Sequence, residues 1–268
     1  MVVEWSIRRC LLCRGEFEGR TFLCRECSDR YREGPLPASI RQQFYEALDR
    51  EYPARSNTYG SYNEPAGLLQ AIARLPRNAR ILELGSGGGH LGVTLASMGF
   101  TRITLSDFTT TTLAAIRERL PSIEVVSTDA SSLPFEEESF EAVITTDVIE
   151  HLPDVDEHLV EVSRVLVSDG VYLVKTPNRP IADAYYTLRD MHDSYFWHPS
   201  MFSPEELRAT FGGHGFETKM IPAKRLTGAQ IAKMPGPTIL RRVAGRLPLG
   251  WVPVVLQPHL EVVGKKRR

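Results

Sequence analysis

The chain is poor in several features that would fix its class at once. It has 268 residues but only four cysteines, all within the first 27 positions, so a disulfide framework along the whole chain is excluded. No stretch reaches the ~18 consecutive apolar residues of a membrane-spanning helix. No internal repeat is visible, and the formal net charge is only −1. With 42% hydrophobic residues, one main globular domain with small attachments is the expected organisation.

Glycine, by contrast, is concentrated at one point. The segment 81–90, ILELGSGGGH, predicts a buried strand that runs directly into a glycine cluster, and residues 91–96 continue as a helix. Glycine permits a tight turn in which the backbone approaches a ligand closely, and a helix N-terminus offers unpaired N–H groups. Strand, turn and helix together therefore predict a site for a nucleotide-like ligand.

The glycine cluster fits two kinds of ligand. Gly87, Gly89 and Gly92 match the dinucleotide fingerprint. Alternatively, the tight turn begins at Gly85, directly after the apolar strand, with Glu83 inside the strand end. An acid there would repel a pyrophosphate but would attract a ligand that carries ammonium and sulfonium charges. A tight turn that binds nothing is the third interpretation.

Each of the next three predicted strands ends in an acidic residue. The strands cover residues 101–107, 123–129 and 140–147, and they end at Asp107, Asp129 and Asp147. Asp107 lies about 20 residues beyond the glycine turn, where a carboxylate meets ribose hydroxyls in nucleotide-binding folds. It could also cap the following helix. The order of motifs over residues 81–178 resembles class I S-adenosylmethionine (SAM)-dependent methyltransferases, in the branch that contains ubiquinone-biosynthesis O-methyltransferases and many small-molecule methyltransferases.

This resemblance implies an α/β fold, with a Rossmann-like seven-stranded sheet, the last strand antiparallel, and helices on both faces. The remaining strands are expected at residues 170–178, 215–221 and 260–264, with helices at 155–167 and 204–211.

The resemblance also implies a set of cofactor-binding residues. They are Glu83, Gly85, Gly87, Gly89, Asp107, Phe108, Asp129, Ala130 and Thr146. The glycines would surround the methionine part of SAM, and Asp107 would bind the ribose. Asp129 would accept a hydrogen bond from the adenine amino group while Ala130 donates its backbone N–H. Phe108 either stacks on the adenine or packs against a helix, and Thr146 would lie beside the transferred methyl group.

Four residues are candidates for catalysis: Asp147, His151, His192 and His198. A base is needed only if the acceptor must lose a proton, and His151 is the leading candidate, although a structural role at a helix start is equally open. Glu150 and His151 also resemble a pair that holds a divalent metal in some relatives. Leu152 stands where small-RNA 2′-O-methyltransferases carry a further histidine, which argues against that function and against the metal. His192 and His198 belong to an aromatic-rich segment after the fifth strand and rank second as bases.

All four cysteines form two Cys-x-x-Cys pairs: Cys10 with Cys13, and Cys24 with Cys27. Four thiolates at this spacing suit tetrahedral Zn²⁺, and so short a segment needs a metal to fold. Disulfides are the disfavoured alternative, because no apolar signal segment follows Met1, which predicts a reducing, cytoplasmic location. A site closed by four thiolates predicts structural rather than catalytic zinc.

The expected division of the chain has three parts. Residues 1–34 form the zinc module, and residues 35–75 form a linker and helices that cover the active site, with Tyr59 and Tyr62 as candidates to line it. Residues 76–268 form the methyltransferase domain, with a basic, apolar insert at about 222–259.

The C-terminal part is strongly basic. Residues 219–268 contain eleven Lys or Arg and one acid, so this part carries +10 and the rest −11. A predicted helix places four apolar residues on one face, and a segment around Trp251 follows it; the four are Ile239, Leu240, Val243 and Leu247. The insert is either a pocket cover packed on the core or a surface for anionic membrane. Nucleic acid is the less favoured partner.

These patterns favour a cytoplasmic SAM-dependent methyltransferase, peripheral at the inner membrane face, that methylates a hydroxyl or carbon of a small or lipid-linked biosynthetic intermediate. The first alternative is an RNA methyltransferase whose zinc module and basic tail hold phosphates. The second is a non-catalytic SAM-fold scaffold whose zinc module docks a protein.

Overall fold

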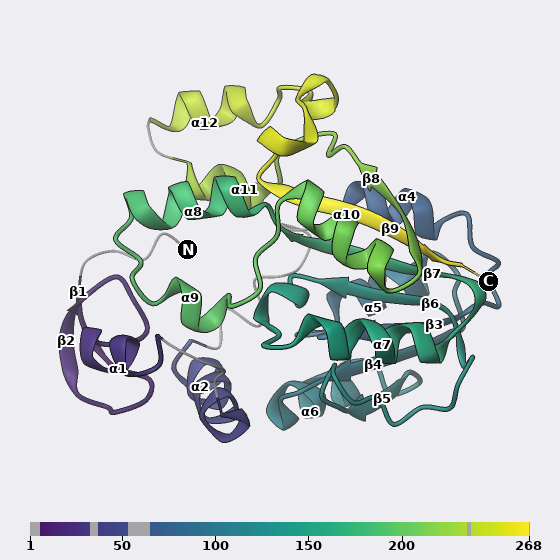
Figure 1. Cartoon of the computed structure of the whole chain (residues 1–268), viewed down its shortest axis with the longest axis horizontal. Helices are drawn as coiled ribbons and strands as arrows, with labels where there is room; N and C mark the ends of the chain where they lie inside the picture. Colours follow the sequence, from purple (N-terminus) through teal and green to yellow (C-terminus); the bar gives the residue numbers. More distant parts are fainter. Residues whose placement is uncertain (1–5, 33–36, 53–64, 235–236, 268) are drawn as a thin grey trace.

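A mixed sheet of seven strands forms the centre of the molecule (Figure 1). The computed structural model describes residues 6–32, 37–52, 65–234 and 237–267. The strand order is β5-β4-β3-β6-β7-β9-β8, and β9 runs antiparallel to both of its neighbours. The strands are β3 (Arg80–Leu84), β4 (Arg102–Asp107), β5 (Glu124–Ser127), β6 (Phe140–Thr146), β7 (Leu166–Pro177), β8 (Phe216–Ile221) and β9 (His259–Lys266). The predicted sheet of seven strands with an antiparallel last strand is confirmed.

The central strands explain where a ligand can bind. β3 and β6 are almost entirely buried, as expected for parallel strands covered on both faces. β3 pairs with β4 on one side and with β6 on the other, so the chain reverses its direction of winding between β3 and β6. Ligands of open α/β sheets bind beyond the carboxyl ends of the strands at such a switch point.

Helices cover both faces of the sheet and enclose two separate cores. One core lies under α7 (Val155–Val165) and α10 (Pro204–Gly213). The other lies under α4 (Ala66–Ile72), α5 (His90–Ser97) and α6 (Thr110–Arg119). The predicted helix over 155–167 ends two residues early, because β7 already begins at Leu166.

The N-terminal part forms a third core of its own. β1 (Ser6–Arg9) and β2 (Glu16–Gly19) pair antiparallel, and α1 (Arg25–Arg30) and α2 (Ala38–Glu51) follow. The buried side chains of this core come from the four-cysteine segment (residues 10–27), from α2 and from α9 (Ser194–Trp197). The four-cysteine segment and α2, which the sequence assigns to separate parts, therefore share one core. Tyr59 and Tyr62 lie outside the described residues.

The remaining helices lie beyond the ends of β7 and β8. α8 (Arg179–Leu188) follows β7, whereas α11 (Gly228–Lys233) and α12 (Thr238–Ala244) belong to the insert between β8 and β9. Figure 1 shows α12 on the outer side of α11, at the top of the view. Among the described helices, none is long and apolar enough to cross a membrane.

Candidate active site

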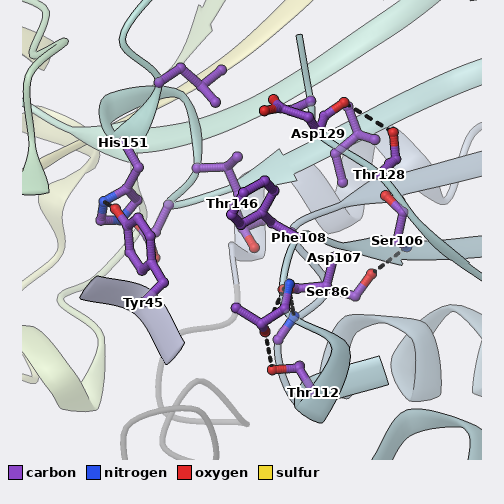
Figure 2. Close-up of a pocket in the computed structure, with 18 of the residues that line it drawn as sticks. Tyr45, Ser86, Ser106, Asp107, Phe108, Thr112, Thr128, Asp129, Thr146 and His151 are labelled. Carbon is purple, nitrogen blue, oxygen red and sulfur yellow. Dashed lines mark hydrogen bonds between the residues drawn. The ribbon is translucent and has the colours of Figure 1, made fainter. Parts of the chain in front are cut away.

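A cavity opens at the carboxyl ends of β3, β4 and β6, and α2 forms part of its wall (Figure 2). Ten of the residues predicted for the site line it: Glu83, Gly85, Gly87, Asp107, Phe108, Asp129, Ala130, Thr146, Asp147 and His151. Gly89, His192 and His198 do not line it. The cavity is also lined by residues that the sequence did not indicate, among them Arg41, Tyr45 and Trp197.

The turn after β3 depends on glycine. Gly85 has a φ of +70°, and a Cβ atom on it would lie 2.4 Å from a methyl group of Val148. No other residue fits both conditions. Asp107 holds the turn in place, because its Oδ2 accepts from the backbone N–H of Gly87 at 2.9 Å. Gly89 is the residue before α5, with a φ of +72°, and turns the chain into that helix.

Glu83 is a buried carboxylate on the cavity wall. Its side chain is 2% exposed, and its Oε2 has no hydrogen-bond partner in the described part of the chain. Burial, followed by the charge of Asp107, raises the pKa of Glu83 to about 8. A buried carboxylate oxygen without a partner is costly, and a cationic ligand in the cavity would satisfy it. The residue thus fits the positive charges of SAM.

One end of the cavity carries an ion pair. Arg41 of α2 donates to Asp129 Oδ2 at 2.8 Å, and its guanidinium carbon lies 5.4 Å from the ring centroid of Phe108. The other Asp129 oxygen accepts from the backbone N–H of Ser131 at 3.0 Å. The helix α2 is therefore fastened over the residues expected to bind adenine. Nothing in the sequence pairs position 41 with position 129, because helical periodicity does not report contacts between distant segments.

The other end of the cavity holds His151 (Figure 2). Its Nδ1 lies 2.5 Å from the backbone carbonyl oxygen of Trp197 and 2.9 Å from the hydroxyl of Tyr45. A carbonyl oxygen only accepts, so this contact places the proton on Nδ1 and makes Nε2 the basic nitrogen. His151 thus has the tautomer that a general base on the cavity wall requires.

Asp147 is held by a cation at the end of β6. Its Oδ2 lies 2.6 Å from Nζ of Lys175, and the two side chains are 9% and 1% exposed. The backbone of Asp147 has a φ of +55°, which is uncommon for a residue other than glycine and is typical of functional turns. To accept a proton, Asp147 would first have to leave its ion pair, so His151 is the better placed base.

A second histidine stands beside His151. The rings of His151 and His198 lie 4.5 Å apart, and Nδ1 of His198 lies 2.7 Å from the hydroxyl of Tyr186. Glu150, His151 and His198 each offer one ligand atom, and these atoms lie within 4.8 Å of one another. The fully buried Glu150 accepts from Thr176 with Oε2, whereas its Oε1 has no partner among the described residues. These three residues could hold a divalent cation, with position 198 supplying the histidine that position 152 lacks.

His192 lies away from the cavity, at the contact with the N-terminal four-cysteine module. Its backbone carbonyl accepts from the hydroxyl of Ser28 at 3.3 Å. The neighbouring Asp193 is fully buried, and its Oδ2 accepts from the backbone N–H groups of Phe22 at 2.7 Å and Leu23 at 3.1 Å. This part of the aromatic-rich segment thus anchors the N-terminal module.

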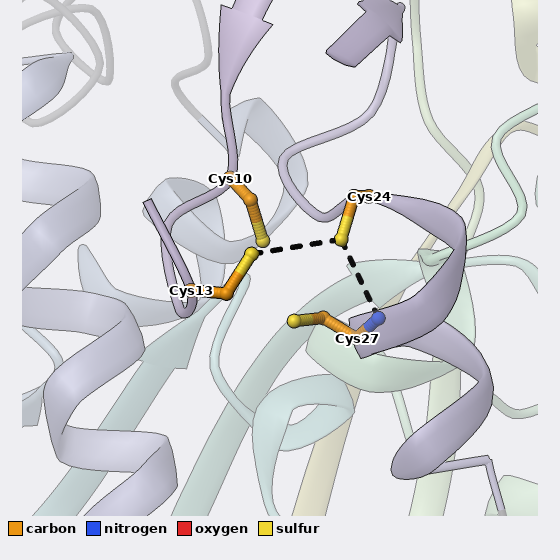
Figure 3. Close-up of side chains that lie close together, drawn as sticks. All are labelled: Cys10, Cys13, Cys24 and Cys27. Carbon is orange, nitrogen blue, oxygen red and sulfur yellow. Dashed lines mark hydrogen bonds between the residues drawn. The ribbon is translucent and has the colours of Figure 1, made fainter. Parts of the chain in front are cut away.

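The four cysteines converge (Figure 3). Their sulfur atoms lie within 4.8 Å of one another, and Cys13 Sγ lies 3.7 Å from Cys24 Sγ. Zn–S bonds of about 2.3 Å in a tetrahedron place sulfur atoms about 3.8 Å apart. All four are free thiols. Cys10 follows β1 and Cys24 caps α1, so the hairpin and the helix each present one pair. The arrangement fits a tetrahedral metal ion.

The region around the cavity is similar to a known protein family. Residues 82–174 match the family model described as "Methyltransferase domain". The match begins in β3 and ends in β7, and so includes the strands whose ends form the cavity. Residues 82–174 therefore form a methyltransferase domain.

Relatives of this methyltransferase domain cover part of the chain. A probable SAM-dependent methyltransferase of Mycobacterium tuberculosis is 35% identical over 99 residues, which are 37% of this chain and 36% of that protein. A ubiquinone biosynthesis O-methyltransferase of Brucella ovis is 31% identical over 142 residues, 49% of this chain and 57% of that protein. The alignments therefore span about a third to somewhat more than half of the length of these relatives.

Solved structures share the fold of this chain. A chain in the complex between the Haloferax volcanii Trm112 methyltransferase activator and a methyltransferase matches with a TM-score of 0.62 and 18% identity, covering 84% of this chain and 98% of that chain. A SAM-dependent methyltransferase of Thermotoga maritima matches with a TM-score of 0.56 and 20% identity, covering 82% of this chain and 98% of that chain.

Proposed function

We propose that this protein transfers the methyl group of SAM to a hydroxyl, or to a carbon, of a small or lipid-linked biosynthetic intermediate. One observation carries the proposal: a single cavity connects the carboxylates of Glu83, Asp107 and Asp129 with the imidazole of His151. The names of the Brucella relatives, ubiquinone biosynthesis O-methyltransferases, support an oxygen acceptor.

The residues at the glycine turn provide the binding side of this function. Bound SAM would supply a methyl group already activated by its sulfonium. Glu83, when ionised, offers a negative charge to the cationic methionine part, and the backbone at Gly85 is free of a Cβ that would prevent close approach. Asp107 offers a carboxylate to ribose hydroxyls, and Asp129, held by Arg41, offers one to the adenine amino group.

The residues at the His151 end provide the acceptor side. Nε2 of His151 accepts the proton that a hydroxyl acceptor loses as the methyl group arrives, while Trp197 and Tyr45 keep the ring in orientation through Nδ1. General-base catalysis of this kind contributes about 10²- to 10⁴-fold. The remaining rate enhancement comes from holding donor and acceptor in line.

The test uses purified protein, radiolabelled SAM and extracts of the source organism separated into organic, aqueous and acid-precipitated fractions. Label in the organic or aqueous fraction is expected, and His151→Gln should lower transfer about 10²- to 10⁴-fold without changing SAM affinity. His214→Gln, in which the histidine follows α10 away from the cavity, is the matched control. Loss of transfer in EDTA with recovery in Mg²⁺ would instead assign His151 to a metal site with Glu150 and His198.

Two results would overturn the proposed acceptor. Ribonuclease-sensitive label in the precipitate would favour the RNA alternative. SAM binding without label in any fraction would favour the scaffold alternative.

We also infer that Cys10, Cys13, Cys24 and Cys27 hold one structural Zn²⁺. The inference is supported by the convergence of four thiols whose sulfur spacing matches a tetrahedral site. Elemental analysis of the purified chain should find about one zinc per molecule, and Cys27→Ser should lose it. A zinc-free wild type with a folded N-terminal module would contradict this inference.

A further inference from the structure

The insert between β8 and β9 exposes apolar side chains. Of the ten large hydrophobic side chains that are exposed among the described residues, seven lie within 239–256. We call them the insert surface; they are Ile239, Leu240, Val243, Leu247, Trp251, Val255 and Leu256. Trp251 is 91% exposed and Ile239 is 69% exposed. These seven side chains are exposed and so do not pack on the core, as they would in a pocket cover.

The exposure is built into the insert, because polar contacts hold its backbone. The buried Gln257 donates to the carbonyl of Val252 at 2.8 Å and accepts from the backbone N–H of Ala223 at 2.8 Å. Asn178, also buried, donates to the carbonyl of Val255 at 2.9 Å. Gly245, directly after α12, lies against Ile231 of α11, since a Cβ there would come within 2.6 Å of the Ile231 side chain. The scaffold is thus fixed from inside while its apolar side chains point outward.

The charge of the insert has one sign. Residues 222–258 contain six Lys or Arg and no Asp or Glu. Arg242 and Arg246 are exposed, and in the sequence they alternate with the apolar residues of the insert surface. Lys224 and Arg225 are exposed as well. Arg241 instead turns inward, with its Nε enclosed. Apolar groups that can enter an acyl layer thus alternate with cations that can contact headgroups.

We propose that the insert surface docks on an anionic lipid bilayer. A protein partner would be expected to meet acids as well as bases at a specific interface, whereas a one-signed cationic rim around Trp and aliphatic side chains suits a headgroup layer. A nucleic acid would use the cations but would leave seven aliphatic and aromatic groups unexplained.

Docking would place the bilayer near the end of the sheet that carries the carboxyl ends of the parallel strands and the cavity. Asn178, which holds the insert, directly follows the carboxyl end of β7. His259, the first residue of β9 after the insert, has its Nε2 3.7 Å from Oδ1 of Asp147, which lines the cavity. A bilayer-bound acceptor would therefore lie near the side of the sheet that the proposed function requires. The docking itself does not depend on methyl transfer.

The test measures sedimentation of the full chain with vesicles in the absence of SAM and acceptor. Binding to phosphatidylcholine vesicles containing 30 mol% phosphatidylglycerol (about a third anionic lipid, enough for the surface potential to act) is expected, with little binding to phosphatidylcholine alone. Arg242→Gln with Arg246→Gln should lower partitioning about 25-fold, at about fivefold per charge. Trp251→Ser should lower it at least tenfold.

Matched controls lie elsewhere on the surface. Val243 and Val160 are helical valines exposed by 53% and 58%, so Val243→Ser should weaken vesicle binding and Val160→Ser should not. Arg208→Gln on α10 is the control for loss of an exposed cation. Equal binding to neutral and anionic vesicles, or no effect of Trp251→Ser, would overturn the proposal. Absence of vesicle binding would also overturn it. RNA binding by the wild type, or dimerisation through Trp251 in ultracentrifugation, would then identify the occupant of the insert surface.

Discussion

At the scale of the residue, Glu83 should make the stability of the folded chain depend on pH. Its pKa in the folded chain is about 8 against an ordinary 4.5, so the folded state holds the proton more tightly than the unfolded state. The free energy of unfolding should therefore fall as pH rises from about 4.5 to about 8. Glu83→Gln removes this dependence: the variant should match the wild type near pH 5 and unfold at a higher temperature near pH 8.5.

At pH 8.5, where Glu83 is ionised, the same substitution should weaken SAM binding at least tenfold in calorimetry, because the negative charge that faces the ligand is lost. Glu118→Gln, an exposed acid on α6, is the control and should change neither property. Parallel pH profiles for Glu83→Gln and wild type would show that Glu83 does not titrate in this range.

At the scale of the element, α2 serves two structures at once. Its Phe44 is buried at 1% exposure and lies 4.9 Å from the ring centroid of Phe196. Phe44 also lines the cavity, together with Arg41 and Tyr45 of the same helix. Phe44→Ala should cost about 3–5 kcal/mol in the N-terminal core and should also weaken SAM binding.

Thermal unfolding and calorimetry measure these two effects. Gln42→Ala, an exposed change on the same helix, should leave both unchanged. If Phe44→Ala lowers stability but leaves SAM affinity intact, α2 is not needed to hold the cavity.

At the scale of the whole molecule, the zinc ion proposed for the four cysteines should affect the cavity from a distance. The zinc module packs on α2 and on α9, and Trp197 of α9 holds His151. Removal of zinc by a chelator should loosen this core, lower SAM affinity at least tenfold and expose the amides of α2 to hydrogen exchange, while the two cores of the sheet remain protected. Protection of α2 that is unchanged after zinc removal would show that the module is independent of the cavity.

The sheet and the cysteine cluster could be predicted from the sequence because their signals are local. An apolar run such as 81–84 specifies a buried strand by itself, and a Cys-x-x-Cys pair forms its own turn. The partners of Asp129 and His151 could not be predicted in the same way. Arg41 and Trp197 come from segments 88 and 46 residues away, and only the assembled sheet brings them together.

The carboxylate of Asp193 bears on the order in which the chain assembles. It accepts from Phe22, which precedes it by 171 residues. Ribosomes add about 5–20 residues per second, so the zinc module leaves the ribosome some ten to thirty seconds before the segment that receives it exists. During that interval Phe22 and Leu11 have no aromatic partner from α9 to cover them. Early binding of a metal ion would hold the module in its folded conformation during that interval. Docking of the module beside the completed sheet would then be the last step of folding.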